Sequence, residues 1–486
     1  MPPATRYRYV ILALLCALAM ITYMDRAANG SAKNLIMQDL NANGSNYTAD
    51  DFFYVLMAFQ LAYALFEVPS GFLGDTFGPR STLLRVVLWW TLFVALTAFT
   101  GLTLPGGFYV GFGVLVGLQF LFGVGEAGAF PNISKALYNW FPASQRGTAK
   151  SIIWMSARFM GGLTPVLWVL LVDLGGATWR EALGLFAAAA AVWCVVFALV
   201  FRNTPAESSR VNDAELATIY AGRVEAQRKV VVPWGKLIRS RNLWALCGMY
   251  VVTNFCWYFL MYDLPTRMKA EFGHLNTSDL GKIQLALLSG APLLVGMFGC
   301  LAGGFFSDWF IRRTGNRKWG RRLPGMVGYG MAGVCYTAAT LARVYDESNV
   351  WLFAGLLIAM GFFNDLIMAP AWAVAQDVGR EYAATVSGAM NMFGNLVGAV
   401  TGIFFTGLVQ KHFPANPSAF EAVAGGAAGA SLGNAERSVF QNNDAVIILF
   451  TTYTLVYFVG VGLWMLIDAT KPIAPADPQA GESTPA

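Results

Sequence analysis

Residues 23–26 read Tyr23-Met24-Asp25-Arg26, and they follow an apolar run, residues 10–22, that contains no charged side chain. On insertion scales an aspartate or an arginine at the centre of a membrane costs about 2.5 to 3.5 kcal/mol. A carboxylate and a guanidinium at that depth therefore indicate a polar cavity, and the rest of the chain is interpreted as the wall around it. Neighbouring residues on a helix point about 100° apart. We expect Arg26 to bind an anion and Asp25 to take a proton; a structural ion pair is the alternative.

The composition is that of a membrane protein. Of 486 residues, 56% are hydrophobic and 13% are charged, whereas soluble domains have roughly 25% charged residues. The apolar runs are long enough to cross a hydrocarbon core of about 30 Å. No cleavable signal peptide is evident, because the first apolar run continues into Asp25-Arg26. The class is therefore an all-α polytopic membrane protein.

The apolar runs predict twelve spans. Short loops rich in Lys and Arg mark the cytoplasmic side. Such residues precede the first span, follow the fourth (Arg146 and Lys150) and crowd the link after the eighth (residues 312–322), whereas residues 41–51 and 101–109 contain none. Both termini are therefore predicted to be cytoplasmic in a multi-pass protein of the inner or plasma membrane. The predicted spans are residues 9–36, 51–73, 81–101, 109–138, 146–172, 182–202, 241–268, 283–306, 324–343, 350–375, 383–409 and 444–468.

Two halves are visible in the sequence. The stretch Gly71–Arg80 ends the second span, and Gly304–Arg313 repeats its pattern after the eighth. Duplicated six-span units are how many transporters build a midplane site between two moving halves. We predict a first half at residues 1–202, a polar cytoplasmic linker at 203–240 and a second half at 241–468. Residues 410–440 are expected to form an external loop and residues 469–486 a disordered cytoplasmic tail.

Residues 71–80 resemble the loop motif of the major facilitator superfamily, G-x-L-a-D-r-x-G-r-k. Thr76 and Pro79 replace basic positions of that motif. The resemblance covers nearly the whole chain and implies the major facilitator fold, with twelve transmembrane helices in two pseudo-symmetric six-helix halves. The positions that match are Gly71, Leu73, Gly74, Asp75, Gly78 and Arg80.

Three further stretches, residues 23–27, 125–131 and 140–146, resemble the anion:cation symporter branch of that family. This branch takes up hexuronates, galactonate, glucarate, phthalate and similar organic anions with protons, and is related to sialin-type carriers. The resemblance implies that Asp25 and Glu126 bind protons and that Arg26 helps to hold the anion. It also places Tyr63 and Asn391 at substrate-contacting positions.

The chain departs from the branch at three positions. Gln119 stands where members usually have arginine, Arg158 stands where galactonate-type carriers have glutamine, and Glu67 stands where glutamine is common. We infer that the cationic anchor has moved from the fourth span to the fifth. Sugar acids remain the leading substrates, with aromatic or small dicarboxylates as the alternative.

The chemistry and spacing of four polar residues also indicate that they line the cavity. No acid lies within a helical turn of Arg158, so its partner is a ligand or another helix, and its fork suits a carboxylate. Gln119 lies two turns before Glu126 on the same face and is expected to line the cavity. Asn391 and Asn395 are four residues apart and share a face, from which they would contact substrate. For each of these residues, a contact between helices is the alternative.

A gate is predicted where the two motif copies lie. Asp75 is expected to meet the start of a helix or a basic residue of another span in one conformation only, and Asp308 to do the same in the second half. Arg80 is assigned to the same gate. These roles concern conformation rather than substrate.

The sequence therefore predicts a proton-coupled transporter that imports an organic anion by alternating access. Asp25 and Glu126 would load protons while the anion binds Arg26 and Arg158. The alternatives are an exchanger or facilitator of the same anions, and a non-transporting sensor or membrane enzyme. No ATP-binding G-x-x-x-x-G-K-[ST] motif and no C-x-x-C pair occur, so we expect no cofactor, no metal and no enzymatic activity. The expected partners are the anion, protons and the lipid bilayer, with no nucleic acid, and the chain is expected to be a monomer.

Overall fold

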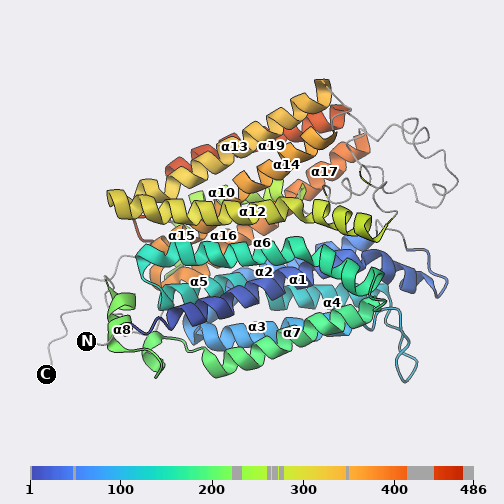
Figure 1. Ribbon diagram of the computed structural model, residues 1–486, viewed down its shortest axis with the longest axis horizontal. Helices are drawn as coiled ribbons and strands as arrows, with labels where there is room; N and C mark the ends of the chain where they lie inside the picture. The colour runs from blue at the N-terminus through green and yellow to red at the C-terminus, as the bar shows by residue number, and fades with distance from the viewer. Residues whose placement is uncertain are drawn as a thin grey trace.

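The computed structural model describes residues 3–47, 51–221, 232–259, 264, 272, 278–345, 350–412 and 443–473. Nearly all of them are helical, and the long helices run side by side along the longest axis of the molecule (Figure 1). The predicted external loop beyond residue 412 and the tail beyond residue 473 lie outside the described residues.

Six crossings form the first half. The fourth consists of two helices, α4 and α5, and the fifth continues from α6 into a π-helical segment, η2 (Val169–Asp173). The helices are α1 (Arg8–Asn41), α2 (Phe52–Phe77), α3 (Pro79–Thr97), α4 (Phe112–Glu126), α5 (Ala129–Trp140), α6 (Arg146–Trp168) and α7 (Trp179–Val200).

Six more crossings form the second half. The tenth is again divided, into α14 and α15, and the eleventh consists of α16, a π-helical segment η7 (Gly394–Ala399) and α17. The helices are α10 (Arg241–Tyr258), α12 (Asp279–Thr314), α13 (Arg317–Tyr345), α14 (Val350–Asp365), α15 (Met368–Gly379), α16 (Ala383–Phe393), α17 (Val400–His412) and α19 (Asn443–Leu466).

The twelve crossings agree with the span count predicted from apolar runs. Within the described ranges, nine helical stretches are long and apolar enough to cross a membrane, and one of them, Trp351–Thr406, contains two successive crossings. Helices α10 and α13 complete the set. In Figure 1 the second half lies above the first, with α6 and α12 packed against each other where the halves meet.

A carboxylate and a proline explain why the fourth and tenth crossings are divided. Helix α4 ends at Glu126 and α14 ends at Asp365, and each acid is followed five residues later by a proline, Pro131 or Pro370. Proline has no N–H for the carbonyl four residues earlier, so it interrupts the hydrogen-bond ladder at that point. The two halves therefore place a helix break directly after a buried acid at equivalent positions.

The link between α12 and α13 is shorter than predicted. Helix α12 continues to Thr314, Gly315 adopts φ +70° and donates its N–H to Ile311 O at 2.8 Å, and α13 begins at Arg317. This left-handed glycine cap ends one helix and allows an immediate return. The basic residues expected in a loop therefore lie on helical turns. Lys150, which lies near the start of the fifth predicted span (146–172), is fully buried on α6.

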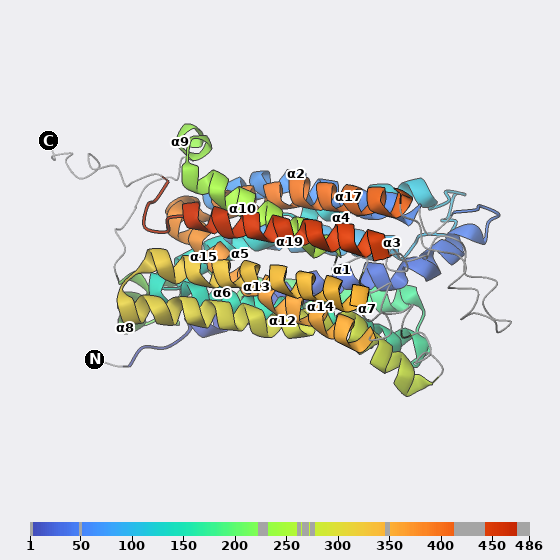
Figure 2. The same ribbon diagram turned by 90° about the horizontal axis from the view of Figure 1, so that it is seen from above.

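The predicted linker contains two short helices, α8 (Asp213–Tyr220) and α9 (Trp234–Ile238). Both lie at the end of the bundle where α1 begins and α19 ends (Figure 2). This end also contains Asp75 and Asp308, and we refer to it as the predicted cytoplasmic end. The carboxylate of Glu215 on α8 accepts hydrogen bonds from Thr5 Oγ1 at 2.6 Å and from the backbone N–H groups of Tyr7 and Arg8. The linker is thus attached to the first turn of α1.

Candidate functional site

A small cavity of about 40 Å³ lies between the two halves. Helices α1, α2, α5 and α6 of the first half form one side, and α10, α15, α16 and η7 of the second half form the other. Its lining combines two arginines, three asparagines, one threonine, one methionine and four aromatic rings. The residues are Arg26, Tyr63, Phe130, Trp154, Arg158, Thr253, Asn254, Trp257, Met368, Asn391 and Asn395.

Arg26 reaches into this cavity from α1. Its Nε donates to Glu126 Oε1 at 2.6 Å, and its guanidinium lies 4.3 Å from the centroid of the Tyr63 ring. The side chain of Glu126 has no exposed surface, whereas that of Arg26 is 21% exposed. Arg26 Nη2 is a buried donor that has no hydrogen bond among the described residues. Arg26 therefore pairs with Glu126 through Nε and keeps an unused N–H donor, on Nη2, for a ligand in the cavity.

Asp25 points elsewhere, as expected from its neighbouring position on the helix. It is 1% exposed, and neither carboxylate oxygen has a hydrogen bond within the described part of the chain. The indole of Trp90 on α3, whose N–H also has no acceptor there, lies beside it. The structure thus separates the cavity-facing guanidinium from a second buried acid behind α1.

Arg158 is the second cavity arginine, and its partner comes from the other half. Its Nε and Nη2 donate to Asp365 Oδ2 and Oδ1 at 2.5 and 3.0 Å, and its Nη1 donates to the hydroxyl of Tyr23 at 2.5 Å. The guanidinium also lies 4.0 Å from the centroid of the Trp257 ring. A ligand or another helix was expected to supply the partner of Arg158, and the structure provides Asp365 of α14.

Beside Arg26, a polar layer joins α2 to the eleventh crossing. Glu67 Oε1 accepts hydrogen bonds from the amides of Asn391 and Asn395, and Asn391 also donates to Tyr63 Oη at 3.2 Å. Asn395 Oδ1 accepts from Gln60 at 3.1 Å. Glu67 is fully buried and forms no salt bridge within the described residues, although the charge of Arg26 lies close enough to interact with it. Its role was missed because the sequence analysis noted only its departure from glutamine.

Gln119 does not line the cavity. Its amide donates to Asn29 Oδ1 and Thr97 Oγ1, each at 3.4 Å, within the first half. This geometry is the contact between helices that the sequence analysis kept as the alternative. Arg158 therefore lines the cavity, whereas Gln119 fills a neutral site among α1, α3 and α4.

Aromatic rings close the cavity toward the predicted cytoplasmic end. Phe130 stacks on Trp154 with ring centroids 4.5 Å apart, and Trp154 contacts Trp372 at 5.6 Å. Lys150 lies under this floor, 4.1 Å from the Trp372 ring, and donates to Ser134 Oγ at 3.1 Å. It has no carboxylate partner in the described ranges. The sequence analysis used Lys150 only as a marker of the cytoplasmic side, so its buried position beneath these rings was not identified.

Both motif aspartates contact the first turn of a helix in the opposite half. Asp75 accepts from Thr385 N at 2.8 Å, and Asp308 accepts from Thr148 N at 2.6 Å. Negative charge at a helix N-terminus is favoured because the free N–H groups and the helix dipole point at it. Lys135 pairs with Asp75 at 3.2 Å and Arg321 with Asp308 at 2.8 Å. The predicted cytoplasmic end is closed in this conformation.

Arg80, which the sequence analysis assigned to the gate, makes its hydrogen bonds within the first half. Its backbone N–H donates to Asn203 Oδ1 at 2.9 Å and its Nη2 to Ala198 O at 2.6 Å. Both acceptors belong to the end of α7 or directly follow it, in the same half. Among its hydrogen bonds none crosses to the second half in the described residues, so it joins α3 to α7 rather than one half to the other.

Comparison with known proteins gives a consistent result. The family model described as Major Facilitator Superfamily matches residues 15–402. The chain is 32% identical to the probable sulfoacetate transporter SauU of Cupriavidus necator, over 83% of this chain and 88% of that protein. It is 29% identical to the probable galactarate/D-glucarate transporter GudP of Escherichia coli, over 82% and 86% of the two chains. Solved structures resemble it as well: that of the proton:xylose symporter XylE covers 96% of this chain and 97% of its own, with a TM-score of 0.67 at 14% identity.

Proposed function

This chain belongs to the major facilitator superfamily, and we propose that it imports a small organic anion with two acidic groups together with protons. It is a multi-pass membrane transporter rather than an enzyme. The chemical class of substrate follows from Arg26 and Arg158, which line the same cavity from α1 and α6. That pair of guanidiniums is the observation on which the proposal rests.

Two arginines in one cavity suit a dianion. A guanidinium binds a carboxylate or a sulfonate through parallel charge-assisted hydrogen bonds, so one acidic group at each end of a short molecule satisfies both. Two relatives are named for such molecules: sulfoacetate has a carboxylate and a sulfonate, and galactarate and glucarate have two carboxylates. We therefore place aldarates and sulfoacetate before the monoanionic sugar acids.

Proton coupling follows from competition for the arginines. Glu126 holds Arg26 and Asp365 holds Arg158 when no anion is bound. An anion replaces a carboxylate at a guanidinium at lowest cost when that carboxylate is protonated, because an unpaired buried charge costs several kcal/mol. Each acidic group of the substrate would then enter with one proton. Asp25, which has no cationic partner in the described residues, is a further proton acceptor next to this system.

Alternating access requires the halves to separate at the cavity. A volume of about 40 Å³ holds one or two water molecules, whereas sites for small ligands occupy about 300–1,000 Å³. We propose that the six-helix units at residues 1–202 and 241–468 rock about this site. The Asp75 and Asp308 contacts hold the predicted cytoplasmic end shut until the anion and protons are bound.

Uptake into proteoliposomes tests the proposal. An inward proton gradient should drive accumulation of labelled galactarate or sulfoacetate, and unlabelled dianions should compete at least tenfold better than galactonate, because loss of one charged hydrogen-bonding pair costs about 1.5–3 kcal/mol. Glu126→Gln should abolish accumulation but retain exchange of labelled for unlabelled anion across the membrane.

The matched control is Asp39→Asn, which removes a partly exposed carboxylate that pairs with Arg180 at 2.5 Å, away from the cavity lining. This variant should transport like the unmodified protein. Uptake that ignores both the proton gradient and Glu126→Gln would instead identify an exchanger or facilitator. Absence of uptake and exchange for every organic acid in the series would favour the non-transporting sensor.

A further inference from the structure

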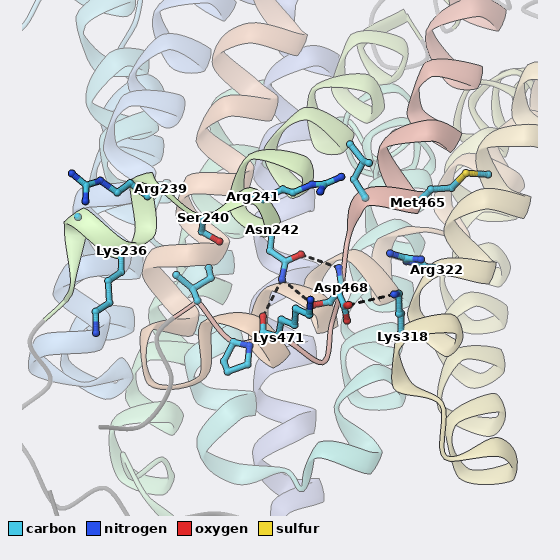
Figure 3. A pocket seen from close by; sticks show the side chains of 14 residues that line it. Lys236, Arg239, Ser240, Arg241, Asn242, Lys318, Arg322, Met465, Asp468 and Lys471 are labelled. Carbon is cyan, nitrogen blue, oxygen red and sulfur yellow. Dashed lines mark hydrogen bonds and ion pairs between the residues drawn. The ribbon is translucent and has the colours of Figure 1, made fainter. Parts of the chain in front are cut away.

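A second pocket lies outside the transport pathway, at the predicted cytoplasmic end of the second half. It has a volume of about 700 Å³ and is open to the surroundings. Four parts of the chain form it: α9 of the linker with the residues after it, the start of α10, the start of α13, and the end of α19 with the residues that follow it (Figure 3). None of its residues lines the cavity between the halves.

The pocket is strongly cationic. One carboxylate, Asp468, is present, and it already accepts from Thr470 N and Oγ1 and pairs with Lys318 at 3.4 Å. Four of the cations make no hydrogen bond or ion pair through their side chains within the described residues. The six cations are Lys236, Arg239, Arg241, Lys318, Arg322 and Lys471.

Hydrogen bonds hold the walls of this basic pocket in place. The amide of Asn242 donates to Asp468 O and Lys471 O, each at 2.9 Å, and its Oδ1 accepts from Asp468 N at 2.9 Å (Figure 3). Arg322, which is 8% exposed, donates from Nε to Ile467 O at 2.6 Å. The turn after α19 is thereby fixed against α10 and α13. The basic side chains therefore belong to a segment whose backbone is fixed by hydrogen bonds to α10 and α13.

Exposed apolar side chains lie within two residues of the lining on α9 and α10, and Met465 is part of the lining. Trp234, Ile238 and Trp244 are 44%, 60% and 46% exposed, and Met465 of the lining is 51% exposed. Tryptophan beside Lys and Arg at the end of spanning helices is typical of the headgroup level of a bilayer. Clusters of basic residues between such helices on the cytoplasmic side suit anionic lipid headgroups.

We propose that the basic pocket binds the phosphate of an anionic membrane phospholipid, with the acyl chains against Trp234, Ile238 and Trp244. Inorganic phosphate shares the charged chemistry but has no apolar part to contact the exposed surface of these side chains. The bound headgroup would connect the linker to α10, α13 and the end of α19. Arg321, one residue from Arg322, holds Asp308 at the closed end, so the site adjoins the gate.

Lipid titration of the purified full-length protein tests this assignment. In an uncharged detergent, phosphatidylglycerol should raise the thermal unfolding midpoint, whereas phosphatidylcholine and inorganic phosphate at equal concentration should not. The triple variant Arg239→Gln, Arg241→Gln, Lys471→Gln removes side chains without contacts of their own in the described part of the chain. It should weaken the apparent affinity for phosphatidylglycerol roughly a hundredfold, since each basic residue contributes about fivefold near an anionic surface.

The matched control is Arg312→Gln, Arg313→Gln, Arg317→Gln, which removes the same charge from exposed residues at the same end. It should retain the affinity for phosphatidylglycerol. An equal loss in both triple variants would mean diffuse attraction and overturn the pocket. An equal midpoint shift with inorganic phosphate would overturn the lipid assignment. Neither measurement depends on transport, so the result is independent of the proposed substrate.

Discussion

Arg158 and Asp365 are 207 residues apart in sequence and come from different halves, yet they form a two-point ion pair inside the bundle. Breaking a buried pair by removing one partner costs about 3–5 kcal/mol because the other charge remains without compensation. Removing both avoids that cost. The pair therefore offers a way to separate a structural role of Arg158 from a role in binding the anion.

We predict that Arg158→Gln and Asp365→Asn each lower the thermal unfolding midpoint and that the double variant recovers most of the loss, as a coupled pair does in a double-mutant cycle. Transport should not recover with it, because the double variant has no second guanidinium for the anion. Unfolding scans and galactarate uptake, measured on the same four proteins, check this. Recovery of uptake in the double variant would assign Arg158 a purely structural role.

At the residue scale, the sequence analysis identified which side chains are unusual but not what they contact. Arg158 was expected to need a partner from another helix or a ligand, and that much can be read from the apolar residues around it. Asp365 as that partner depends on how α6 and α14 meet, which no local pattern encodes. Gln119 and Arg80 show the reverse case, since polar side chains on a helix can bond within their own half.

At the element scale, glycine determines how closely α6 approaches α12. A Cβ at Gly147 would overlap the carboxylate of Asp308 and the guanidinium of Arg321. The signal for the two divided crossings was present in the sequence as an acid five residues before a proline, but both were predicted as continuous spans. A break was not inferred because proline inside a membrane helix is often accommodated by a kink.

Gly147→Ala should open the predicted cytoplasmic end. Overpacking costs about 1–3 kcal/mol, and here that cost falls on the contact that closes the gate. A reporter cysteine at Ser387→Cys on α16 measures opening, because Ser387 is fully buried in this conformation. A maleimide should label this cysteine roughly five to a hundred times faster in the Gly147→Ala variant than without that substitution. Gly184→Ala, where a Cβ meets nothing within 4 Å, should leave the rate unchanged. Equal rates in both would show that the α6–α12 contact does not control opening.

The attachment of α8 to α1 gives a pH-dependent stability. Burial raises the pKa of Glu215, but the hydrogen bonds from Thr5, Arg8 and Tyr7 and the charge of Arg8 outweigh it, so that the pKa is lowered overall. A lowered pKa in the folded state stabilises the protein above the unfolded value, about 4.3 for glutamate, and this contribution disappears as the pH falls through the folded pKa. Glu215→Gln should therefore unfold at a lower temperature than the unmodified protein at pH 7, with the difference shrinking below about pH 4. A difference in unfolding temperature that did not depend on pH would mean that packing of the side chain, and not the charge of Glu215, attaches α8 to α1.

At the scale of the whole molecule, the predictable part is the architecture. Runs of apolar residues long enough to cross a bilayer determine the number of crossings, and the repeated motif at Gly71–Arg80 and Gly304–Arg313 reveals the two halves. The conformation is not predictable in the same way, because the proposed alternating access requires one sequence to adopt both an outward-open and an inward-open form. The charged residues in the sequence must be compatible with both forms. Their pattern therefore does not indicate which ion pairs form in only one of them.

The two aspartate contacts make a test of rigid halves possible. Asp75 closes α2 against α16, and Asp308 closes α12 against α6, so they lie on different interfaces between the same two bodies. Each of Asp75→Asn and Asp308→Asn removes a charge from a helix N-terminus and from an ion pair. We expect each to speed maleimide labelling at Ser387→Cys, and the double variant to multiply the two factors, because both contacts bias one equilibrium and their free energies add.

Asp279→Asn is the control for that experiment, since Asp279 is an exposed first-turn acid at the opposite end of α12. It removes the same charge without touching a closed contact, and should leave the labelling rate as it is. The decisive comparison is Asp308→Asn, because Ser387 lies on α16, away from the interface where Asp308 acts. If that variant left Ser387→Cys protected while Asp75→Asn exposed it, the halves would not move as rigid bodies. Each interface would then open by itself, and transport would need two gates rather than one rocking motion.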